Sequence, residues 1–369
     1  MSQPVTKAID HRIGYFVSPH GFGHAARAAG VMAAIHEMDD SFHFDIFSSV
    51  PRWFFQDSLA GGFSYHRLQT DIGIVQKDPL NEDLSETVRY LNEFFPLDHS
   101  RISDQVDLIR TMKIELIICD IAPMGIAVAR EAGIPSVLVE NFTWDWIYEG
   151  YLDQEPRLEK HVLYLRGLFS ETDYHVQTEP VCRYGKKADL KTLPISRKVR
   201  TPASAIRRQL GVPKDNKMMT ITMGGIPDHY PFLDQLASHR GVHFVVPGAS
   251  RSTETHGNLI LLPHHSDFFH PDLINASDAV VGKVGYSTLA EVYYAGIPFG
   301  YVPRAAFRES PVIGRFIEKN MAGMGIEPDE FQDGSWVYRV QRLLALPRVS
   351  RSGSNGAEAV AQFICSLMT

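Results

Sequence analysis

Residues 281–298 read VGKVGYSTLAEVYYAGIP. This stretch joins a short apolar run, Ala279–Val281, to an expected helix, Ser287–Ala295, through a turn that holds Gly282 and Gly285. The two glycines let the backbone turn sharply and approach a ligand closely. The unpaired N–H groups at the start of such a helix favour phosphate. The stretch therefore predicts an α/β sheet with an anion site at the carboxyl end of a strand.

Polar side chains in the same stretch add to this anion site. Ser287 and Thr288 bring hydroxyls to the first helical turn, and Lys283 brings a positive charge toward a diphosphate. Glu291, one turn into the helix, could hold both hydroxyls of a ribose through its two oxygens. A plain strand-to-helix turn capped by a serine is the alternative. The combination of glycines, a lysine and an acid favours a nucleotide site.

The same alternation of short apolar runs and helical stretches extends along the chain. In the first half we expect strands at Ile13–Ser18, Phe42–Ser48, Phe63–Leu68, Glu115–Cys119 and Ser136–Glu140. Asp83–Met112 has the spacing of one long helix or two. In the second half we expect strands at Lys217–Met223, Val242–Val246, Leu259–Leu262, Ala279–Val281 and Phe299–Val302. Strands separated by helices predict parallel sheets with helices on both faces.

Two such halves suit a chain of 369 residues. Residues 180–203 hold breakers and charges without sustained periodicity, and we place the junction near Ile195–Pro202. This predicts an α/β protein with two doubly wound, Rossmann-like domains, 1–198 and 199–349, that face a cleft. The amphipathic helix expected in 354–369 should pack back onto the first domain. The glycine turns after the strands should meet at the cleft.

Composition narrows the class of protein further. The net charge of −7 disfavours a nucleic-acid partner. The three cysteines are widely spaced, which suits a reducing compartment better than a disulfide framework. The N-terminal residues lack the pattern of a signal peptide, and no uncharged apolar run reaches the roughly 20 residues of a membrane span. We expect a cytoplasmic protein, with peripheral membrane contact left open.

A second glycine turn, PHGFGHAAR at 19–27, follows the first expected strand. His24 would lie at a helix N-terminus, where the helix dipole lowers the pKa of an imidazole and keeps it neutral. A neutral histidine in a cleft can act as a general base. His20 is the second candidate base, and Asp120 could orient a histidine. Arg27 could bind a carboxylate or a substrate anion; capping and packing are the alternatives for these residues.

Two cofactor hypotheses fit the sequence poorly, so we expect no bound cofactor. A dinucleotide site pairs its glycine turn with an acid at the end of the second strand, whereas Phe42–Ser48 ends in serines and Asp45 lies within it. The histidine-rich stretch PHHSDFFH, 263–270, lacks the i, i+4 spacing of zinc-binding helices. The chain also has no Asp-x-Asp sequence that could clamp a metal-bound diphosphate. We expect no metal.

The block ENFTWDWIY, 140–148, is expected to bind the acceptor. Trp144 offers a flat apolar face to a sugar or an aromatic acceptor, and Asn141 and Asp145 can hydrogen-bond hydroxyls. Phe22 and Arg27 of the second glycine turn are expected on the same side. A helix that packs on its neighbour through two tryptophans is the alternative.

Residues 285–298 resemble the nucleotide-binding motif of GT-B glycosyltransferases of the MurG type, Gly-x-x-Thr-x-x-Glu followed by Ala-Gly-x-Pro. The resemblance implies that Glu291 binds the donor ribose. It also implies that the preceding loop contacts the diphosphate through Gly285, Tyr286, Ser287 and Thr288. A Gly-Gly loop in such enzymes wraps the diphosphate, which implies that role for Gly224 and Gly225. The loop after the last main strand meets the donor sugar, which implies a sugar contact for Glu309.

A second resemblance extends over most of the chain. Four ordered blocks are similar to the glycosyltransferase-like N-terminal part of plant L-arabinokinases: HGFGHA at 20–25, NFTWDWIY at 141–148, GKVGYST at 282–288 and FRESP at 307–311. The first block also resembles the UDP-sugar hydrolase of pseudaminic acid synthesis, whose histidine in this turn is implicated in catalysis.

These resemblances imply a GT-B glycosyltransferase, hexosyltransferase-like, that moves a sugar from a nucleotide diphosphate-sugar to an acceptor hydroxyl. The resemblance favours a UDP-sugar as donor, with inversion and without metal. The second domain would hold the donor, and the first would hold the acceptor and the base, His24 or His20. A nucleotide-sugar hydrolase, an epimerase and a non-catalytic sugar-nucleotide-binding protein are the alternatives. The tryptophan block favours a bulky acceptor over water.

Overall fold

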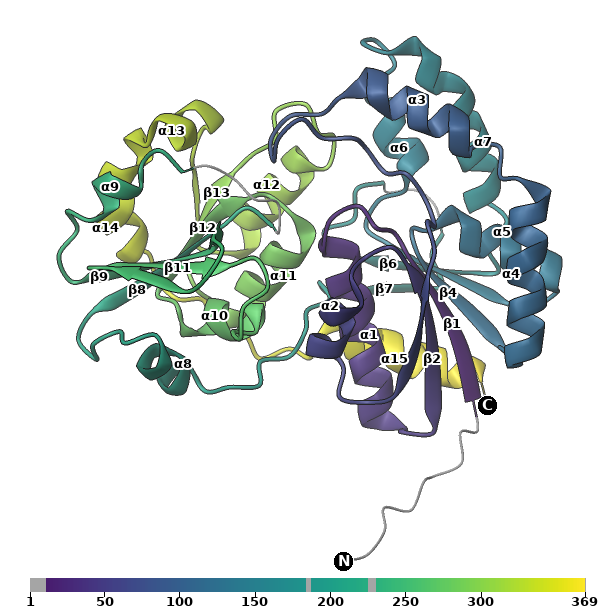
Figure 1. Cartoon of the computed structure of the whole chain (residues 1–369), viewed down its shortest axis with the longest axis horizontal. Coiled ribbons are helices and arrows are strands. Elements are labelled where there is room, and N and C mark those ends of the chain that lie inside the picture. The colour runs from purple at the N-terminus through teal and green to yellow at the C-terminus, as the bar shows by residue number, and fades with distance from the viewer. Residues whose placement is uncertain (1–10, 184–186, 225–229, 369) are drawn as a thin grey trace, which may run out of the picture.

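The computed structural model describes residues 11–183, 187–224 and 230–368. Within these residues the chain forms two lobes, each built around a seven-stranded sheet (Figure 1). The two sheets and their covering helices confirm the predicted α/β architecture. All of the strands expected from apolar runs are present, because Val, Ile, Leu and Phe runs suit strands that are buried on both faces.

The first lobe holds the sheet β3-β2-β1-β4-β5-β6-β7 with all neighbouring strands parallel. Its strands are β1 (His11–Val17), β2 (Phe42–Ser48), β3 (Phe63–Arg67), β4 (Leu116–Asp120), β5 (Ser136–Glu140), β6 (Tyr174–Thr178) and β7 (Leu190–Thr192). The strands β6 and β7 were not predicted, because β6 (YHVQT) mixes polar with apolar residues and β7 has only three residues.

Helices cover both faces of the first sheet. One face carries α1 (Gly23–Met38), α2 (Arg52–Ser58) and α15 (Gly356–Leu367). The other carries α3 (Leu84–Phe94), α4 (His99–Met112), α5 (Pro123–Ala132), α6 (Trp144–Glu149), η1 (Pro156–Leu158) and α7 (Glu159–Phe169). The stretch predicted as one helix or two is two helices, separated where Pro96 cannot donate a helical hydrogen bond.

The second lobe holds the sheet β10-β11-β9-β8-β12-β13-β14, in which β10 is the antiparallel strand among the described residues. Its strands are β8 (Lys217–Thr222), β9 (Val242–Ser250), β10 (Glu254–His256), β11 (Leu259–Pro263), β12 (Ala279–Lys283), β13 (Phe299–Val302) and β14 (Gly323–Gly325). Its helices are α8 (Ala203–Gln209), α9 (Leu233–Leu236), α10 (His270–Ala276), α11 (Tyr286–Ala295), α12 (Ser310–Asn320), α13 (Pro328–Asp333), η2 (Ser335–Arg339) and α14 (Val340–Leu344).

The strand order of each sheet reverses at one point, between β1 and β4 in the first lobe and between β8 and β12 in the second. Ligands of open α/β sheets bind beside such points, at the carboxyl ends of the strands. The helix that follows β1 is α1, the helix that follows β12 is α11, and these two helices contact each other. The two glycine turns therefore meet at the junction of the lobes, as the sequence predicted.

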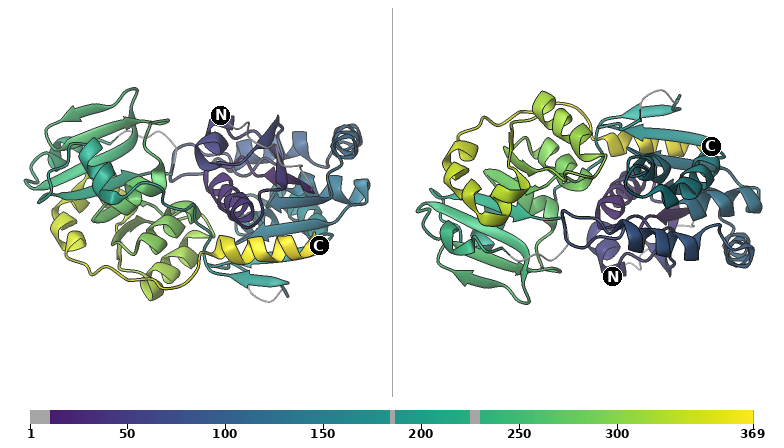
Figure 2. Two further views of the ribbon diagram at one scale, coloured as in Figure 1. Left: turned by 90° about the horizontal axis from the view of Figure 1, so that it is seen from below. Right: turned by 90° about the horizontal axis from the view of Figure 1, so that it is seen from above.

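The last helix, α15, lies against the first lobe (Figure 2). Ala357, Val360 and Ile364 are buried in the same cluster as the apolar face of α1. The small residues of α1, an alanine- and glycine-rich helix, allow this close packing. The chain thus crosses between the lobes twice, once before α8 and once before α15.

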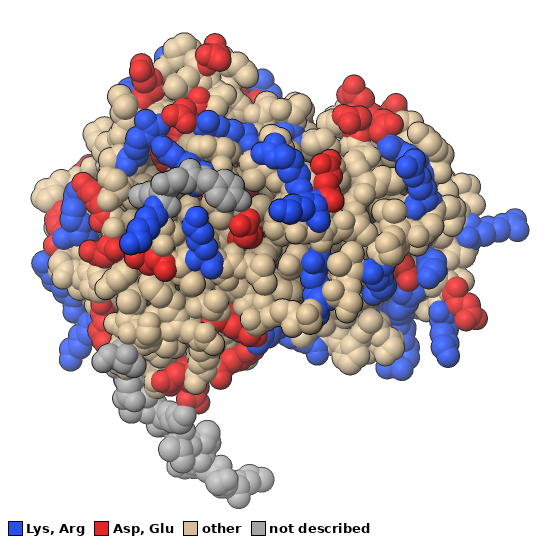
Figure 3. Space-filling view, turned by 180° about the vertical axis from the view of Figure 1, so that it is seen from behind, with Lys and Arg blue, Asp and Glu red and all other residues tan. Residues whose placement is uncertain are grey.

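Further contacts join the lobes away from the switch points. An arm of the first lobe, residues 72–83, places Leu80 in the apolar core of the second lobe and pairs Glu82 with the buried Arg304. From the second lobe, Arg308 reaches back and donates to the Trp146 carbonyl and to Glu149, at 2.6 and 2.8 Å. Charged side chains of both signs gather where the lobes meet on the face drawn in Figure 3.

In the part of the chain that the structure describes, none of the helices combines the length and the apolar character that crossing a membrane would require.

Candidate active site

Two adjoining pockets occupy the junction of the lobes, and both lobes line each of them. The histidine pocket is lined by His20, His24, Arg27, Gln76, Phe142, Lys283, Gly285, Tyr286, Arg304, Phe307 and Glu309, among others. The aromatic pocket is lined by Trp53, Phe54, Arg197, Thr222, Pro247, Gly248, His264, His265, Phe268, Phe269 and His270, among others. Phe22, Gly224, Ser287 and Thr288 line both pockets, so one extended ligand can reach from one to the other.

His24 and Asp120 form a dyad at the carboxyl ends of β1 and β4. His24 lies in the first turn of α1, and its Nδ1 is 2.9 Å from Oδ1 of the fully buried Asp120. An ionised carboxylate only accepts hydrogen bonds, so Nδ1 carries the ring proton, although Nη2 of Arg27 also lies 3.2 Å away. Nε2 of the neutral ring is then a free acceptor, which is the form a general base requires.

Burial and ion pairing set the charges of this dyad. Burial lowers the pKa of the His24 imidazole more than Asp120 raises it, so the pKa lies below its ordinary value. Burial alone would raise the pKa of the Asp120 carboxyl, but Arg27 and the hydrogen bond with His24 outweigh it and lower that pKa. The sequence predicted a neutral His24 from the helix dipole; the direction agrees, with burial as the main cause.

His20 lies in the same pocket with the opposite hydrogen-bonding character. Its Nδ1 accepts from the backbone N–H of Ile74 at 3.4 Å, which leaves the proton of a neutral ring on Nε2. Burial lowers the pKa of His20 well below its ordinary value, and the nearby Arg304 adds to this effect. The edge of Trp144 packs against the ring, with the ring centres 5.0 Å apart. His20 thus offers an N–H donor, whereas His24 offers a bare nitrogen.

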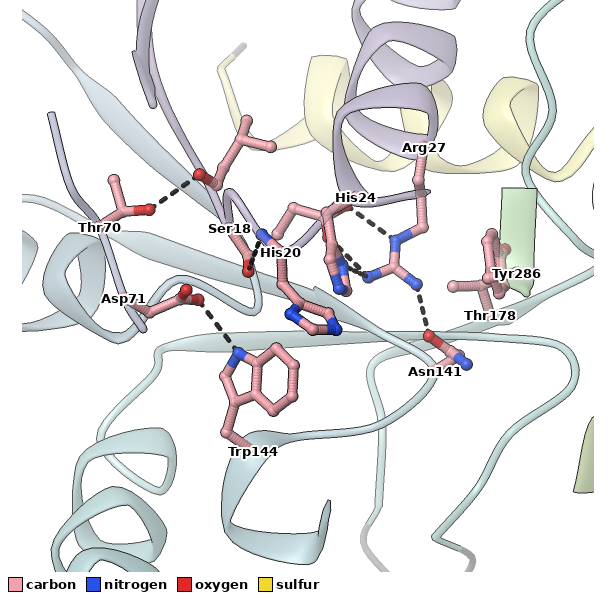
Figure 4. A network of polar contacts seen from close by, with 12 residues as sticks. Ser18, His20, His24, Arg27, Thr70, Asp71, Asn141, Trp144, Thr178 and Tyr286 are labelled. Carbon is pink, nitrogen blue, oxygen red and sulfur yellow. Dashed lines mark hydrogen bonds and ion pairs between the residues drawn. The ribbon is translucent and has the colours of Figure 1, made fainter. Parts of the chain in front are cut away.

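Arg27 connects the dyad to the second lobe. Its guanidinium donates twice to Asp120, at 2.6 and 2.8 Å. It also donates to Oδ1 of Asn141 at 2.7 Å (Figure 4). Nδ2 of Asn141 donates in turn to Oε1 of Glu309 at 2.6 Å. The guanidinium also lies 4.7 Å above the ring of Tyr286. Arg27 and Asn141 thus hold Asp120 and Glu309, and Arg27 also lines the histidine pocket. Their contact with the acceptor stays a prediction.

Glu309 faces the histidine pocket from the loop after β13. Burial raises the pKa of its carboxyl, and the hydrogen bond from Asn141 opposes this shift only in part. Phe22, the remaining predicted acceptor residue on this turn, lines both pockets and stacks on Phe54, with ring centres 4.8 Å apart.

The structure does not bring the other two predicted acceptor residues to the cleft surface. Trp144 is 1 % exposed, stacks on Tyr148 and donates from Nε1 to Asp71 at 3.1 Å (Figure 4). Burial raises the pKa of Asp71 to about 7. Asp145 lines a separate cavity and pairs with Arg183 at 3.0 Å. Both residues have packing partners within the first lobe because α6 lies against α7, so we do not assign them to the acceptor.

The second lobe contributes a helix N-terminus and a lysine. The first residue of α11 is Tyr286, and the residue before it, Gly285, carries no side chain that could cap the helix. The free N–H groups of this turn adjoin Ser287, Thr288 and Lys283 at the pocket. Gly224 follows β8 with φ +72°, which a residue with a side chain rarely adopts. Gly225 lies outside the described residues.

Glu291, the predicted ribose ligand, is 5 % exposed and already has a partner on each oxygen. Arg197 donates from Nη2 to Oε1 at 2.8 Å, and Nδ1 of His270 lies 2.5 Å from Oε2. Burial would raise the pKa of this carboxyl, but Arg197 and His270 lower it. Arg197 and His270 line the aromatic pocket, and they lie between that pocket and Glu291.

Several pocket residues were missed by sequence reasoning. Gln76 enters from the irregular arm, and Trp53 comes from α2, where no motif marks it. Arg197 lies in the basic junction SRKVR, whose charges indicated a linker. Its place in the site follows from contacts with distant positions, such as the ion pair with Glu291, 94 residues further along the chain.

Two histidines of the stretch 263–270 face carboxylates. Among the described residues, no group of three His, Cys, Asp or Glu side chains is arranged to hold a metal ion. His265 faces Asp57, at 2.9 Å, and His270 faces Glu291.

Comparison with solved structures defines the class of the fold. A UDP-glucosyltransferase from Polygonum tinctorium superposes with a TM-score of 0.64 at 13 % identity and covers 98 % of this chain and 99 % of its own. MurG of Acinetobacter baumannii superposes with a TM-score of 0.56 at 13 % identity, over 96 % and 99 % of the two chains. At such identities the likeness shows the fold alone, and that fold is GT-B.

The family follows from the sequence. The family described as Glycosyl transferase family 1 matches residues 11–341. This chain therefore belongs to glycosyl transferase family 1. It is also 26 % identical, over 354 residues, to the L-arabinokinase of Arabidopsis thaliana. That match covers 95 % of this chain and 34 % of the relative, so the chain spans about a third of the relative's length.

Proposed function

We propose that the protein transfers a sugar from a nucleotide diphosphate-sugar to an acceptor hydroxyl, with His24 as the general base. The observation that carries the proposal is the His24–Asp120 dyad, whose histidine lines the same pocket as the uncapped N-terminus of α11. A base and an anion site from opposite lobes thus adjoin one space, and membership of glycosyl transferase family 1 supports sugar transfer.

Each side chain then has a defined task. Nε2 of His24 takes the acceptor proton as the acceptor oxygen attacks the anomeric carbon, while Asp120 holds the ring and stabilises the imidazolium that forms. The leaving diphosphate gains charge, which the N–H groups of α11 and Lys283 stabilise without a metal. Attack from the first lobe on a sugar whose diphosphate sits on the second is a single displacement and inverts the anomeric centre.

The rest of the donor extends along the two pockets. Glu309 and the N–H of His20 adjoin the proposed sugar position in the histidine pocket and can bind its hydroxyls. We assign the ribose to the group formed by Glu291, Arg197 and His270, and the base to the aromatic pocket. A UDP-sugar and a hexosyl transfer are the specific forms that the motif resemblance favours.

Hydrolysis of the same donor is the second candidate. The sequence argued for a bulky acceptor from an exposed tryptophan face, and the burial of Trp144 removes that argument. Water attacking with the same base would give a nucleotide-sugar hydrolase. Incubating the enzyme with the sugar donor alone separates the two functions. A hydrolase releases free sugar as fast without an acceptor as with one. A transferase releases free sugar slowly, and an added acceptor diverts the sugar to a glycosylated product.

A thermal-shift panel of UDP, dTDP, GDP, CMP, ADP and NAD tests the donor site. At 100 times its Kd, the nucleotide that fits is expected to stabilise the protein by about 2.7 kcal/mol. Glu291→Gln should lose at least tenfold in affinity for it, because an uncharged amide holds Arg197 and His270 less firmly beside the proposed ribose position. Glu318→Gln on α12 is the matched control, because Glu318 accepts a hydrogen bond from Tyr301 on the surface, away from both pockets. No shift with any nucleoside diphosphate would contradict the proposal.

The pH dependence of turnover tests the base. The base acts when neutral, so kcat should rise with pH through the pKa of His24 and level off above it. Because burial lowers this pKa below the ordinary value of 6.5, the midpoint should lie below pH 6.5. Steady-state kinetics at saturating donor from pH 4.5 to 8.5 measures it. If the residual kcat of His24→Gln fell at low pH with the same midpoint, the titrating group would have to be a residue other than His24.

A further inference from the structure

We propose that the nucleobase of the donor is held between the two lobes, with the indole of Trp53 from the first lobe stacked on it. This inference rests on the proposed function, since it names the wall that receives the base of the same donor. It makes Trp53 a binding residue that no motif of the sequence marks.

The position of the aromatic pocket follows from the proposed diphosphate site. The pocket meets the histidine pocket at Gly224, Ser287 and Thr288, which surround the N-terminus of α11. A nucleoside attached to a diphosphate at that turn can extend in two directions, toward the dyad or into the aromatic pocket. The sugar to be transferred must lie at the dyad, so the nucleoside lies in the aromatic pocket.

The walls of the aromatic pocket come from both lobes. The second lobe supplies the carboxyl ends of β9 and β11, together with Phe268 and Phe269. The first lobe supplies Phe22, Trp53 and Phe54. A slot with aromatic side chains on opposite walls suits a flat ring, because every nucleobase has a face that stacks on an aromatic side chain.

The ring of Trp53 already presents one face to a flat nitrogen heterocycle. The imidazole of His265 stacks on it with ring centres 4.0 Å apart and planes 18° apart. The side chain of His265 is 50 % exposed and is otherwise held by an ion pair with Asp57, also on the surface. A nucleobase is larger than an imidazole and can take this face, since the displaced histidine keeps access to water.

The wall that carries Trp53 is fixed to the second lobe. The guanidinium of Arg197 lies between the rings of Phe54 and Phe269, 4.8 Å from the centre of each. It also donates to Ser58 of the first lobe at 3.2 Å and to Glu291 of the second at 2.8 Å. Phe54, the residue next to Trp53, is thus held against the second lobe through Arg197. The nucleobase would therefore bind to a wall that is already in position.

Intrinsic fluorescence tests the stacking directly. The chain has four tryptophans, and Trp144, Trp146 and Trp336 are buried, whereas Trp53 is partly exposed. Titration with the nucleoside diphosphate that the thermal-shift panel selects should quench the emission of the wild type. Trp53→Phe should lose most of that quenching while it keeps Kd within about threefold, because a phenyl ring still stacks.

Calorimetric titration of Trp53→Leu completes the test, since leucine keeps apolar volume and removes the flat ring. Its Kd for the nucleoside diphosphate should rise at least tenfold, and its Kd for inorganic pyrophosphate should not change. Tyr338→Leu, an exposed aromatic position in the second lobe, is the matched control. An unchanged nucleotide Kd in Trp53→Leu, with wild-type binding intact, overturns this inference alone, as does equal weakening of pyrophosphate. No nucleotide binding by the wild type overturns the proposed function and this inference together.

Discussion

Replacing His24 by alanine is expected to lower kcat by about 10²- to 10⁴-fold, the range that a general base contributes. The donor KM should change little, because Nε2 meets the acceptor proton and not the nucleotide. Steady-state kinetics with the identified donor and acceptor measures both constants. His43→Ala is the matched control, since His43 is a partly buried histidine of the same lobe whose ring contacts Ser64.

A second variant separates the base from the residue that positions it. In Asp120→Asn the amide can donate to Nδ1 of His24, which favours the tautomer with its proton on Nε2, where no base remains. We expect a loss of kcat comparable to that of His24→Ala, together with an acid limb that disappears. If His24→Ala kept kcat within threefold of the wild type, the dyad would have to be regarded as structural and the base sought elsewhere.

Arg27→Met is expected to lower the free energy of unfolding by about 3–5 kcal/mol, the usual cost of removing one partner of a buried ion pair. Arg27 is 1 % exposed and supports Asp120, Asn141 and the ring of Tyr286 together. Without it, the Asp120 carboxylate stays buried and keeps only the hydrogen bond from His24 among the contacts of this network. At 2–4 °C per kcal/mol for a domain of this size, Tm should fall by roughly 10 °C.

Urea unfolding followed by circular dichroism measures this difference. Arg89→Met is the matched control, because Arg89 pairs with Glu86 and Glu93 on the exposed face of α3 and such pairs contribute little. A loss below about 1 kcal/mol for Arg27→Met would mean that Asp120 takes up its proton or finds another partner, and that the network is not held by Arg27.

The fold was predictable from the sequence because its strands are buried on both faces. Runs such as Leu116–Cys119 are apolar throughout, and glycine turns follow two such runs. The positions of His24 and Asp120 beside the switch point follow from the same logic, since each stands at or just after the carboxyl end of a strand. The local sequence was sufficient to predict the position of a side chain wherever a single strand or helix determines that position.

The remaining site residues depend on contacts between distant segments. The sequence cannot show whether a tryptophan stacks on a ligand or fills a core. Trp144 is buried because His20, Phe142 and Tyr148 pack around it and Asp71 accepts its N–H. Asn141 and Asp145 are four residues apart, yet one meets Glu309 across the cleft and the other meets Arg183 in a separate cavity. The partners of Glu291 come from the linker and from α10, which no local pattern relates to it.

The return of α15 to the first lobe makes the second lobe, in topological terms, an insertion between β7 and α15. Described residues 11 and 368 both belong to the first lobe, and the second lobe is joined to it by two neighbouring connections (Figure 2). A stretching force applied at these two residues would act on the first lobe and would place no tension on the second lobe. It would separate α15 from α1, the helix that carries His24, before it unfolded any strand of the second lobe.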